Sequence, residues 1–135
     1  MSAPNVKQVV PFLMVASMEK SLRYYVEGLG FARTNQWIVD GKIRWCWLEL
    51  GGAALMLQES DRDVQAGKGM SLWFQCEDAL ALYDEFRSRG IETAEPFVGN
   101  SLWDVKLTDP DGYNLHFESP TDVPEETKLS EVRKG

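Results

Sequence analysis

The chain has 135 residues, of which 44% are hydrophobic and 26% charged, a length and composition typical of one globular domain and unlike a disordered chain. Its 14 Lys and Arg residues are scattered among 21 Asp and Glu residues, giving a net charge of −7, so the clustered positive charge needed for nucleic-acid binding is lacking. No apolar run approaches the roughly 20 residues that span a bilayer, and the N-terminus has no secretory signal pattern, so we expect a cytoplasmic protein with no nucleic-acid or membrane partner.

The chain repeats one pattern of elements with a period of roughly 60 residues. In the first copy, a strand-like run over residues 10–15 precedes Ser17, a favourable helix N-cap. Apolar residues then recur at helical spacing as far as the glycine-containing turn at residues 28–30. Three further strands are predicted over residues 31–40, 42–50 and 53–59, with turns at Asp40-Gly41 and Gly51-Gly52.

The second copy follows the same order. A strand over residues 71–76 precedes Asp78, the predicted N-cap of a helix that ends at Gly90. Strands are predicted over residues 91–98, 101–108 and 113–119, with a turn at residues 109–112. The polar segment 60–68 links the copies. The sequence therefore predicts one domain over residues 1–119, with repeat one at about 7–59 and repeat two at about 69–119.

The charged tail, residues 120–135, follows this domain. In the tail, Asp122 and Glu125 are spaced like a capping box, which predicts a short surface helix.

Each copy has the order βαβββ, which predicts an α+β fold. One helix covers one face of a four-stranded sheet and leaves the other face without a partner. Two such sheets placed edge to edge, with the helices outside, form an open, mostly antiparallel barrel with a central cleft.

Strand side chains alternate between the two faces of a sheet, so each strand offers one set of side chains to the cleft. In the last strand, residues 113, 115 and 117 are all apolar and are expected under the helix, which leaves Asn114, His116 and Glu118 facing the cleft. The repeat places Met56 at the position of His116. The predicted ligand-binding residues are Phe12, Met14, Met56, Gln58, Ser71, Trp73, Gln75, Asn114, His116 and Glu118. Apolar walls with a few polar groups are typical of small-molecule sites.

The cysteines and most of the tryptophans say little about the functional site. Cys46 and Cys76 lie in strand-like runs without the spacing of a zinc or redox site, so we expect small buried hydrophobic residues. Alternation places Trp73 in the cleft. The facing of the other four tryptophans stays open; these are Trp37, Trp45, Trp47 and Trp103.

Two stretches resemble the vicinal oxygen chelate superfamily, which includes glyoxalase I, extradiol dioxygenases, fosfomycin-resistance enzymes and bleomycin-resistance proteins. The first runs from Val15 to Tyr25 and continues through Gly28-Leu-Gly-Phe31, and the second is Asp109-Pro-Asp-Gly-Tyr-Asn-Leu-His-Phe-Glu118. The likeness extends over residues 7–119 and implies the glyoxalase/bleomycin-resistance fold.

The resemblance also bears on cofactors. In metal-dependent members, ligands come from four inward-facing positions, which here hold Val10, Met56, Ser71 and His116. Only His116, the single histidine of the chain, is a credible ligand, whereas a hard divalent ion needs several N or O donors. The resemblance therefore implies a protein without metal or cofactor, similar to the bleomycin-resistance branch, whose members are homodimers that hold the drug in grooves lined by aromatic and acidic groups.

The leading hypothesis is a non-catalytic protein that sequesters a small aromatic or cationic compound such as a glycopeptide antibiotic. Two alternatives stay open. One is an enzyme of the same superfamily, either a metal-dependent lyase, isomerase or dioxygenase or a metal-free enzyme with His116 as general base. The other is a homodimeric interaction or regulatory module with a vestigial cleft. For His116 itself, a ligand contact and a histidine satisfied by Asn114, Ser71 or a backbone carbonyl are both open.

Overall fold

The computed structural model describes residues 4–60 and 70–133, and its elements form two modules and a short tail. The first module contains β1 (Phe12–Val15), α1 (Met18–Leu22), the π-helical turn η1 (Arg23–Gly28), β2 (Ala32–Val39), β3 (Lys42–Leu50) and β4 (Ala53–Glu59). The second contains β5 (Ser71–Gln75), α2 (Ala79–Ser88), β6 (Phe97–Gly99), β7 (Leu102–Thr108) and β8 (Asn114–Pro120). The tail ends in α3 (Leu129–Val132).

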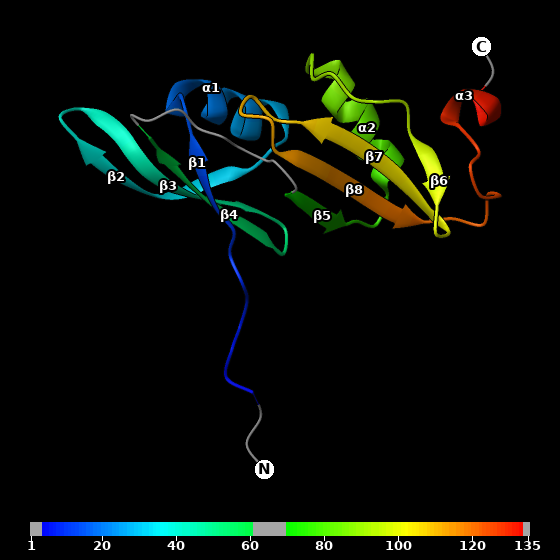
Figure 1. Cartoon of the computed structure of the whole chain (residues 1–135), viewed down its shortest axis with the longest axis horizontal. Helices are drawn as coiled ribbons and strands as arrows, with labels where there is room; N and C mark the ends of the chain where they lie inside the picture. The colour runs from blue at the N-terminus through cyan, green and yellow to red at the C-terminus, as the bar shows by residue number, and fades with distance from the viewer. Residues whose placement is uncertain (1–3, 61–69, 134–135) are drawn as a thin grey trace.

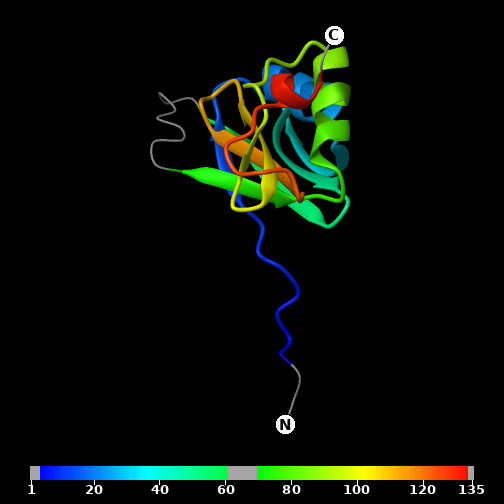
Figure 2. The same ribbon diagram turned by 90° about the vertical axis from the view of Figure 1, so that its right-hand side faces the viewer.

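Each module has a four-stranded sheet with the same topology. The strand orders are β1-β4-β3-β2 and β5-β8-β7-β6. The first and last strands of each module pair in parallel and the other pairs are antiparallel. Figures 1 and 2 show the two sheets side by side, with α1 and α2 on the same side of them. The predicted α+β fold of two βαβββ repeats in open sheets is therefore confirmed.

Both helices of the modules begin at the residues that the sequence predicts. The Ser17 hydroxyl accepts a hydrogen bond from the Lys20 amide at 3.3 Å, and the Asp78 carboxylate accepts one from the Ala81 amide at 3.1 Å. These bonds satisfy backbone donors that the first turn of a helix leaves free. The first helix then widens into η1, where the Leu29 amide donates to the Tyr24 carbonyl at 2.9 Å.

Two tight turns of the same type join corresponding strands of the modules. At the β2–β3 turn, Asp40 and Gly41 have φ angles of 52° and 75°, as expected for the hairpin dipeptide. At the β6–β7 turn, Asn100 and Ser101 have φ angles of 52° and 64°. The sequence does not predict this second turn, because serine rarely adopts the left-handed region.

The strand predicted over residues 91–98 is wrong for most of its length. Only Phe97–Gly99 form β6. Residues 91–96, which end at the buried Pro96, form no strand. Proline has no N–H to donate to a strand ladder. The Ala94 amide donates to the Lys106 carbonyl of β7 at 3.1 Å, but the alternating pattern of this segment does not lead to a continuous strand ladder.

The predicted capping box in the tail is also wrong. The Glu125 carboxylate instead accepts hydrogen bonds from the Asn100 and Ser101 amides at 2.7 and 3.0 Å. Residues 126–129 then run along β6, and the short helix starts only at Leu129, whose side chain is buried. The predicted linker, residues 60–68, lies outside the described residues apart from Ser60.

The core lies between the sheets and the helices and is continuous across the two modules. Leu13, Val15, Leu115 and Phe117 are buried on the helix side, as strand alternation predicts. The Phe31 ring of the first module meets the Phe74 ring of the second edge to face, with centroids 6.2 Å apart. No helix within residues 4–60 and 70–133 is long and apolar enough to cross a membrane.

Candidate functional site

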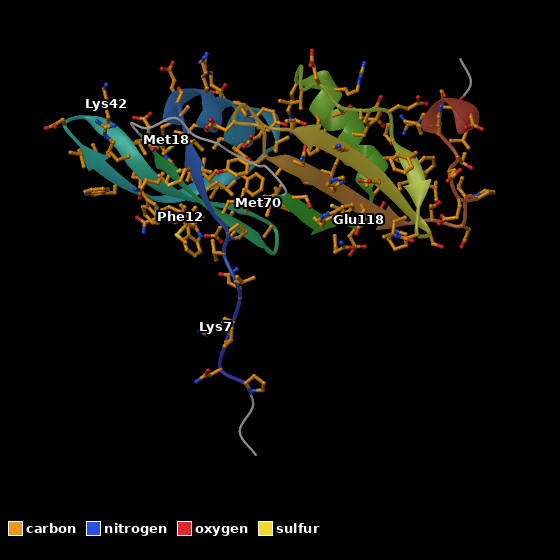
Figure 3. All side chains as sticks on the ribbon, viewed as in Figure 1. Lys7, Phe12, Met18, Lys42, Met70 and Glu118 are labelled. Atoms are coloured by element: carbon orange, nitrogen blue, oxygen red, sulfur yellow. The ribbon has the colours of Figure 1, made fainter. Side chains whose placement is uncertain are left out.

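We call the side of the two sheets opposite α1 and α2 the open face. Strand register places all ten predicted ligand-binding residues on it as neighbouring pairs, since directly paired residues share a face. The pairs are Phe12 with Met56, Met14 with Gln58, Ser71 with Asn114, Trp73 with His116, and Gln75 with Glu118. Figure 3 shows Phe12 and Glu118 on this side, away from the helices. The pairs form one group on each sheet. Ligand binding by these residues remains a prediction.

The tryptophans whose facing the sequence leaves open are now placed. Trp45 pairs with Gln58 and Trp47 with Met56, so both lie on the open face. Trp37 pairs with Trp45 at the outer edge of the first sheet and is 58% exposed. Trp103 is buried on the helix side.

His116 is held by a residue that sequence reasoning missed. Its Nδ1 lies 2.9 and 3.2 Å from the two carboxylate oxygens of Asp104 in β7. A carboxylate only accepts hydrogen bonds, so Nδ1 carries the hydrogen of this contact. The expected partners Asn114 and Ser71 are not used. Alternation in β7, with apolar residues at 103, 105 and 107, is the signal that could have placed Asp104 on the open face.

Trp73 stacks on the same histidine. The indole and imidazole centroids are 3.7 Å apart and their planes differ by only 6°. The indole Nε1 donates to the Ser71 hydroxyl at 2.8 Å, and the residue remains 51% exposed. One face of the indole is therefore covered and its orientation is fixed, while much of the side chain stays accessible.

Charged groups surround this stack. Glu118 pairs across the strands with Asp104 and accepts a hydrogen bond from the Gln75 amide. Lys106 pairs with His116 and is exposed. The two carboxylates outnumber this lysine, so this part of the open face has a local excess of negative charge that favours a cation.

Two hollows lie where the sheets meet, and Trp73 lines both. The first has a volume of about 420 Å³ and lies between the β3–β4 turn and the edge of β5, and it reaches the helix side at Leu82 of α2 and Phe117. The second, of about 350 Å³, is lined by Val9 of the N-terminal segment together with residues of β4 and β5. Both volumes are within the range of small-ligand pockets. Of the ten predicted residues, Trp73 and Gln75 line the first hollow and Trp73 lines the second.

Three titratable groups away from this stack, those of Tyr25, Asp109 and Cys46, lie in buried structural contacts. The Tyr25 hydroxyl donates to Asp109 at 2.6 Å in the buried contact between the modules. Burial raises the pKa of both groups, the tyrosine far above its ordinary range. Burial also raises the pKa of the Cys46 thiol to about 11, and its Sγ lies 3.8 Å from the Met18 sulfur. Cys46 is thus the small buried residue that the sequence predicts, whereas Cys76, at the edge strand β5, is only partly buried.

The residues at the four metal positions of the resembled family do not fit a divalent cation. Val10 and Met56 provide no N or O donor, so only Ser71 and His116 remain, fewer N and O donors than a divalent cation needs. Within the described parts of the chain, no three His, Cys, Asp or Glu residues lie close enough to hold a metal ion.

The comparisons with known proteins agree with this architecture. The family model of the Glyoxalase/Bleomycin resistance protein/Dioxygenase superfamily matches residues 6–117. No curated protein matches the chain significantly in sequence.

Solved structures share the fold. TnmS3, an antibiotic-binding protein from Streptomyces sp. CB03234, superposes with a TM-score of 0.69 at 20% identity, covering 88% of this chain and 100% of that chain. A bleomycin-binding protein complexed with bleomycin superposes with a TM-score of 0.68 at 21% identity, covering 84% and 98%. A putative glyoxalase family protein from Bacillus anthracis has a TM-score of 0.68 at 18% identity, covering 88% and 100%. At these identities the likeness shows the fold.

Proposed function

Because this chain belongs to the glyoxalase/bleomycin resistance protein/dioxygenase superfamily, we propose that it binds a small, partly aromatic and cationic compound on its open face without a metal ion. Sequestration of a drug such as a glycopeptide antibiotic is the corresponding biological role. Neighbours in fold that are named for binding an antibiotic or bleomycin support this proposal.

The observation that carries the proposal is the arrangement around Trp73. The indole is fixed by Ser71 and by the stack on His116, and it borders hollows of about 420 and 350 Å³. A fixed aromatic ring costs little side-chain entropy when a flat ligand stacks on it. The nearby carboxylates of Asp104 and Glu118 favour a positive charge on that ligand.

We also propose that two copies of the chain associate. Large apolar side chains exposed on or beside the open face include Phe12, Trp37, Ile38, Trp73 and Phe97. The N-terminal arm, residues 4–11, leads away from the sheets in Figures 1 and 2, and its Val6 and Val9 are 81% and 89% exposed. Exposed apolar surface of this kind is characteristic of interfaces. Light scattering after size exclusion should give a two-chain mass at tens of micromolar protein, and a one-chain mass would contradict the dimer.

Calorimetric titration with bleomycin tests the binding role. We expect saturable binding with a Kd at or below tens of micromolar, and Trp73→Ala should weaken it by about tenfold through the loss of stacking. Tyr83→Ala is the matched control, because Tyr83 lies on α2 and packs against the core from the helix side. No heat of binding at these concentrations would contradict bleomycin as the ligand class.

One observation favours a second candidate function, a metal-free enzyme. A carboxylate that orients a histidine, as Asp104 orients His116, is also the arrangement of a general base. Mass spectrometry of bleomycin recovered after incubation with the protein separates the two functions. Unchanged bleomycin supports binding alone, whereas a product that disappears with His116→Ala supports catalysis.

A further inference from the structure

The edge of His116 that faces away from Asp104 has no assigned task in binding. The imidazole is 11% exposed, and its only hydrogen bonds within the described residues are those of Nδ1 to Asp104. Since the hydrogen lies on Nδ1, the neutral imidazole carries a lone pair on Nε2. The Asp104 contact thereby determines which ring nitrogen is the acceptor.

We propose that His116 Nε2 is the hydrogen-bond acceptor of the ligand site and that it selects aromatic ligands carrying a cationic N–H donor on a short chain. Asp104 is a positioning residue that holds the hydrogen of the neutral imidazole on Nδ1, which makes Nε2 the acceptor nitrogen. This inference rests on the proposed binding function and names the class of ligand: a ring with an amine or amidinium group.

The geometry of the stack explains why the ligand needs a short carbon linker between its aromatic ring and its amine. The imidazole lies against one face of the Trp73 indole at a centroid distance of 3.7 Å, so a ligand ring can stack only on the opposite face. That ring lies about two stacking distances from the imidazole plane, or about 7 Å. A donor in the plane of the ligand ring does not reach Nε2, whereas an amine on a two-carbon chain can pass over the indole edge.

The charges on the open face agree with a cationic donor. Asp104 and Glu118 are neighbours across β7 and β8, and Lys106 is the opposing positive charge beside His116. A charged N–H donor forms a stronger hydrogen bond than a neutral one. A quaternary ammonium group has the same charge but no N–H, so it serves as the matched comparison.

The test uses 2-(2-naphthyl)ethylamine and its N,N,N-trimethyl derivative, which share ring, chain and charge. The wild-type protein should bind the primary amine about 3- to 10-fold more tightly, as expected for one hydrogen bond to a charged donor. His116→Phe preserves a ring for stacking on Trp73 and should abolish this preference. Asp104→Asn should reduce it, because an amide can donate to Nδ1 and shift the hydrogen to Nε2.

Nitrogen NMR of the wild-type protein labelled with ¹⁵N-histidine provides a readout that does not depend on any variant. The chain has one histidine, so a single imidazole is observed. In the free protein, the neutral imidazole should carry its hydrogen on Nδ1, and the primary amine should shift the Nε2 resonance. Asp104→Asn should change this tautomer pattern, which a merely structural role for Asp104 would leave unaltered.

The outcomes separate this inference from the proposed function. A neutral imidazole with its hydrogen on Nε2 in the free protein, equal affinity for the two naphthyl compounds, or no binding of either compound overturns the role of His116, even if bleomycin binds. Failure to bind bleomycin contradicts that ligand class alone, and the comparison of the naphthyl amines then still decides the role of Nε2.

Discussion

The two modules have the same strand order and the same register, yet their open faces differ in chemistry. Where the first module has Phe12 beside Met56, the second has Trp73 beside His116. Where the first has Trp45 beside Gln58, the second has Asp104 beside Glu118. The backbone repeat therefore fixes positions, while the side chains at these four positions are mainly apolar in the first sheet and mainly polar or charged in the second.

The outer edges of the two sheets differ as well. β2 is eight residues long, and seven of them are exposed. β6 has only three residues, and the tail runs along it: the Val98 amide donates to Thr127, and the Glu126 amide donates to the Val98 carbonyl. A covered edge cannot pair with another strand. We therefore expect the proposed association of two copies to involve the first sheet more readily than the edge of the second.

The largest expected effect tests whether the modules form one cooperative unit. Phe117 and Leu57 occupy equivalent buried positions in β8 and β4. Phe117→Ala should lower the free energy of unfolding by about 3–5 kcal/mol, and Leu57→Ala by about 2–4 kcal/mol. Because Phe31 and Phe74 join the two halves of the core, urea unfolding followed by circular dichroism and by fluorescence should give one coincident transition in both variants. Two separate transitions would show that the modules unfold independently.

The next effect concerns the polar contact between the modules. Asp109 accepts hydrogen bonds from the Tyr25 hydroxyl and from the amides of Asp111 and Tyr113. Asp109→Ala leaves these donors without a partner and should cost about 3 kcal/mol in urea unfolding. Asp111→Ala is the control in the same turn, since its hydrogen bond to the Ala16 amide is exposed, and it should cost under about 1 kcal/mol. Equal costs for the two variants would contradict a special role of Asp109.

A smaller effect on stability is expected at the outer edge of the second sheet, where the tail covers β6. Leu129→Ala should weaken the tail on β6 and cost about 2 kcal/mol, because its side chain is buried. Hydrogen exchange of the Val98 amide should accelerate, since its acceptor Thr127 is held by the tail. Val132→Ala removes an exposed side chain of the same helix and should leave this exchange rate unchanged. Unaltered Val98 exchange in Leu129→Ala would mean that the tail does not protect the edge.

The smallest effect is a pH dependence. Burial raises the pKa of Asp109 above its ordinary value of 3.8, so the folded state binds the proton more tightly than the unfolded state. The resulting stabilisation is fully present below about pH 4 and decreases as the pH rises through the folded pKa. The difference in unfolding free energy between the wild type and Asp109→Asn should follow this sign. A difference that grows in favour of the wild type with rising pH would contradict it.

Much of the fold follows from local chemistry. The caps at Ser17 and Asp78 and the turn at Asp40-Gly41 depend on neighbouring backbone groups, and all three form as predicted. Strand alternation placed the ten predicted residues on one face, because the alternation of strand side chains is a property of the backbone. The alternating pattern of residues 91–96 was misleading because Pro96 has no N–H for a strand ladder. The spacing of Asp122 and Glu125 was misleading because the Glu125 carboxylate binds the distant amides of Asn100 and Ser101.

The sequence by itself thus determined the βαβββ repeats and the side chains offered to the open face, since both follow from residue type and spacing. Only the tertiary structure decided that Asp104 holds His116, that Trp73 stacks on that imidazole, and that the tail covers β6. These contacts join residues on different strands or distant segments. Their formation depends on the three-dimensional packing of those segments, which no local pattern encodes.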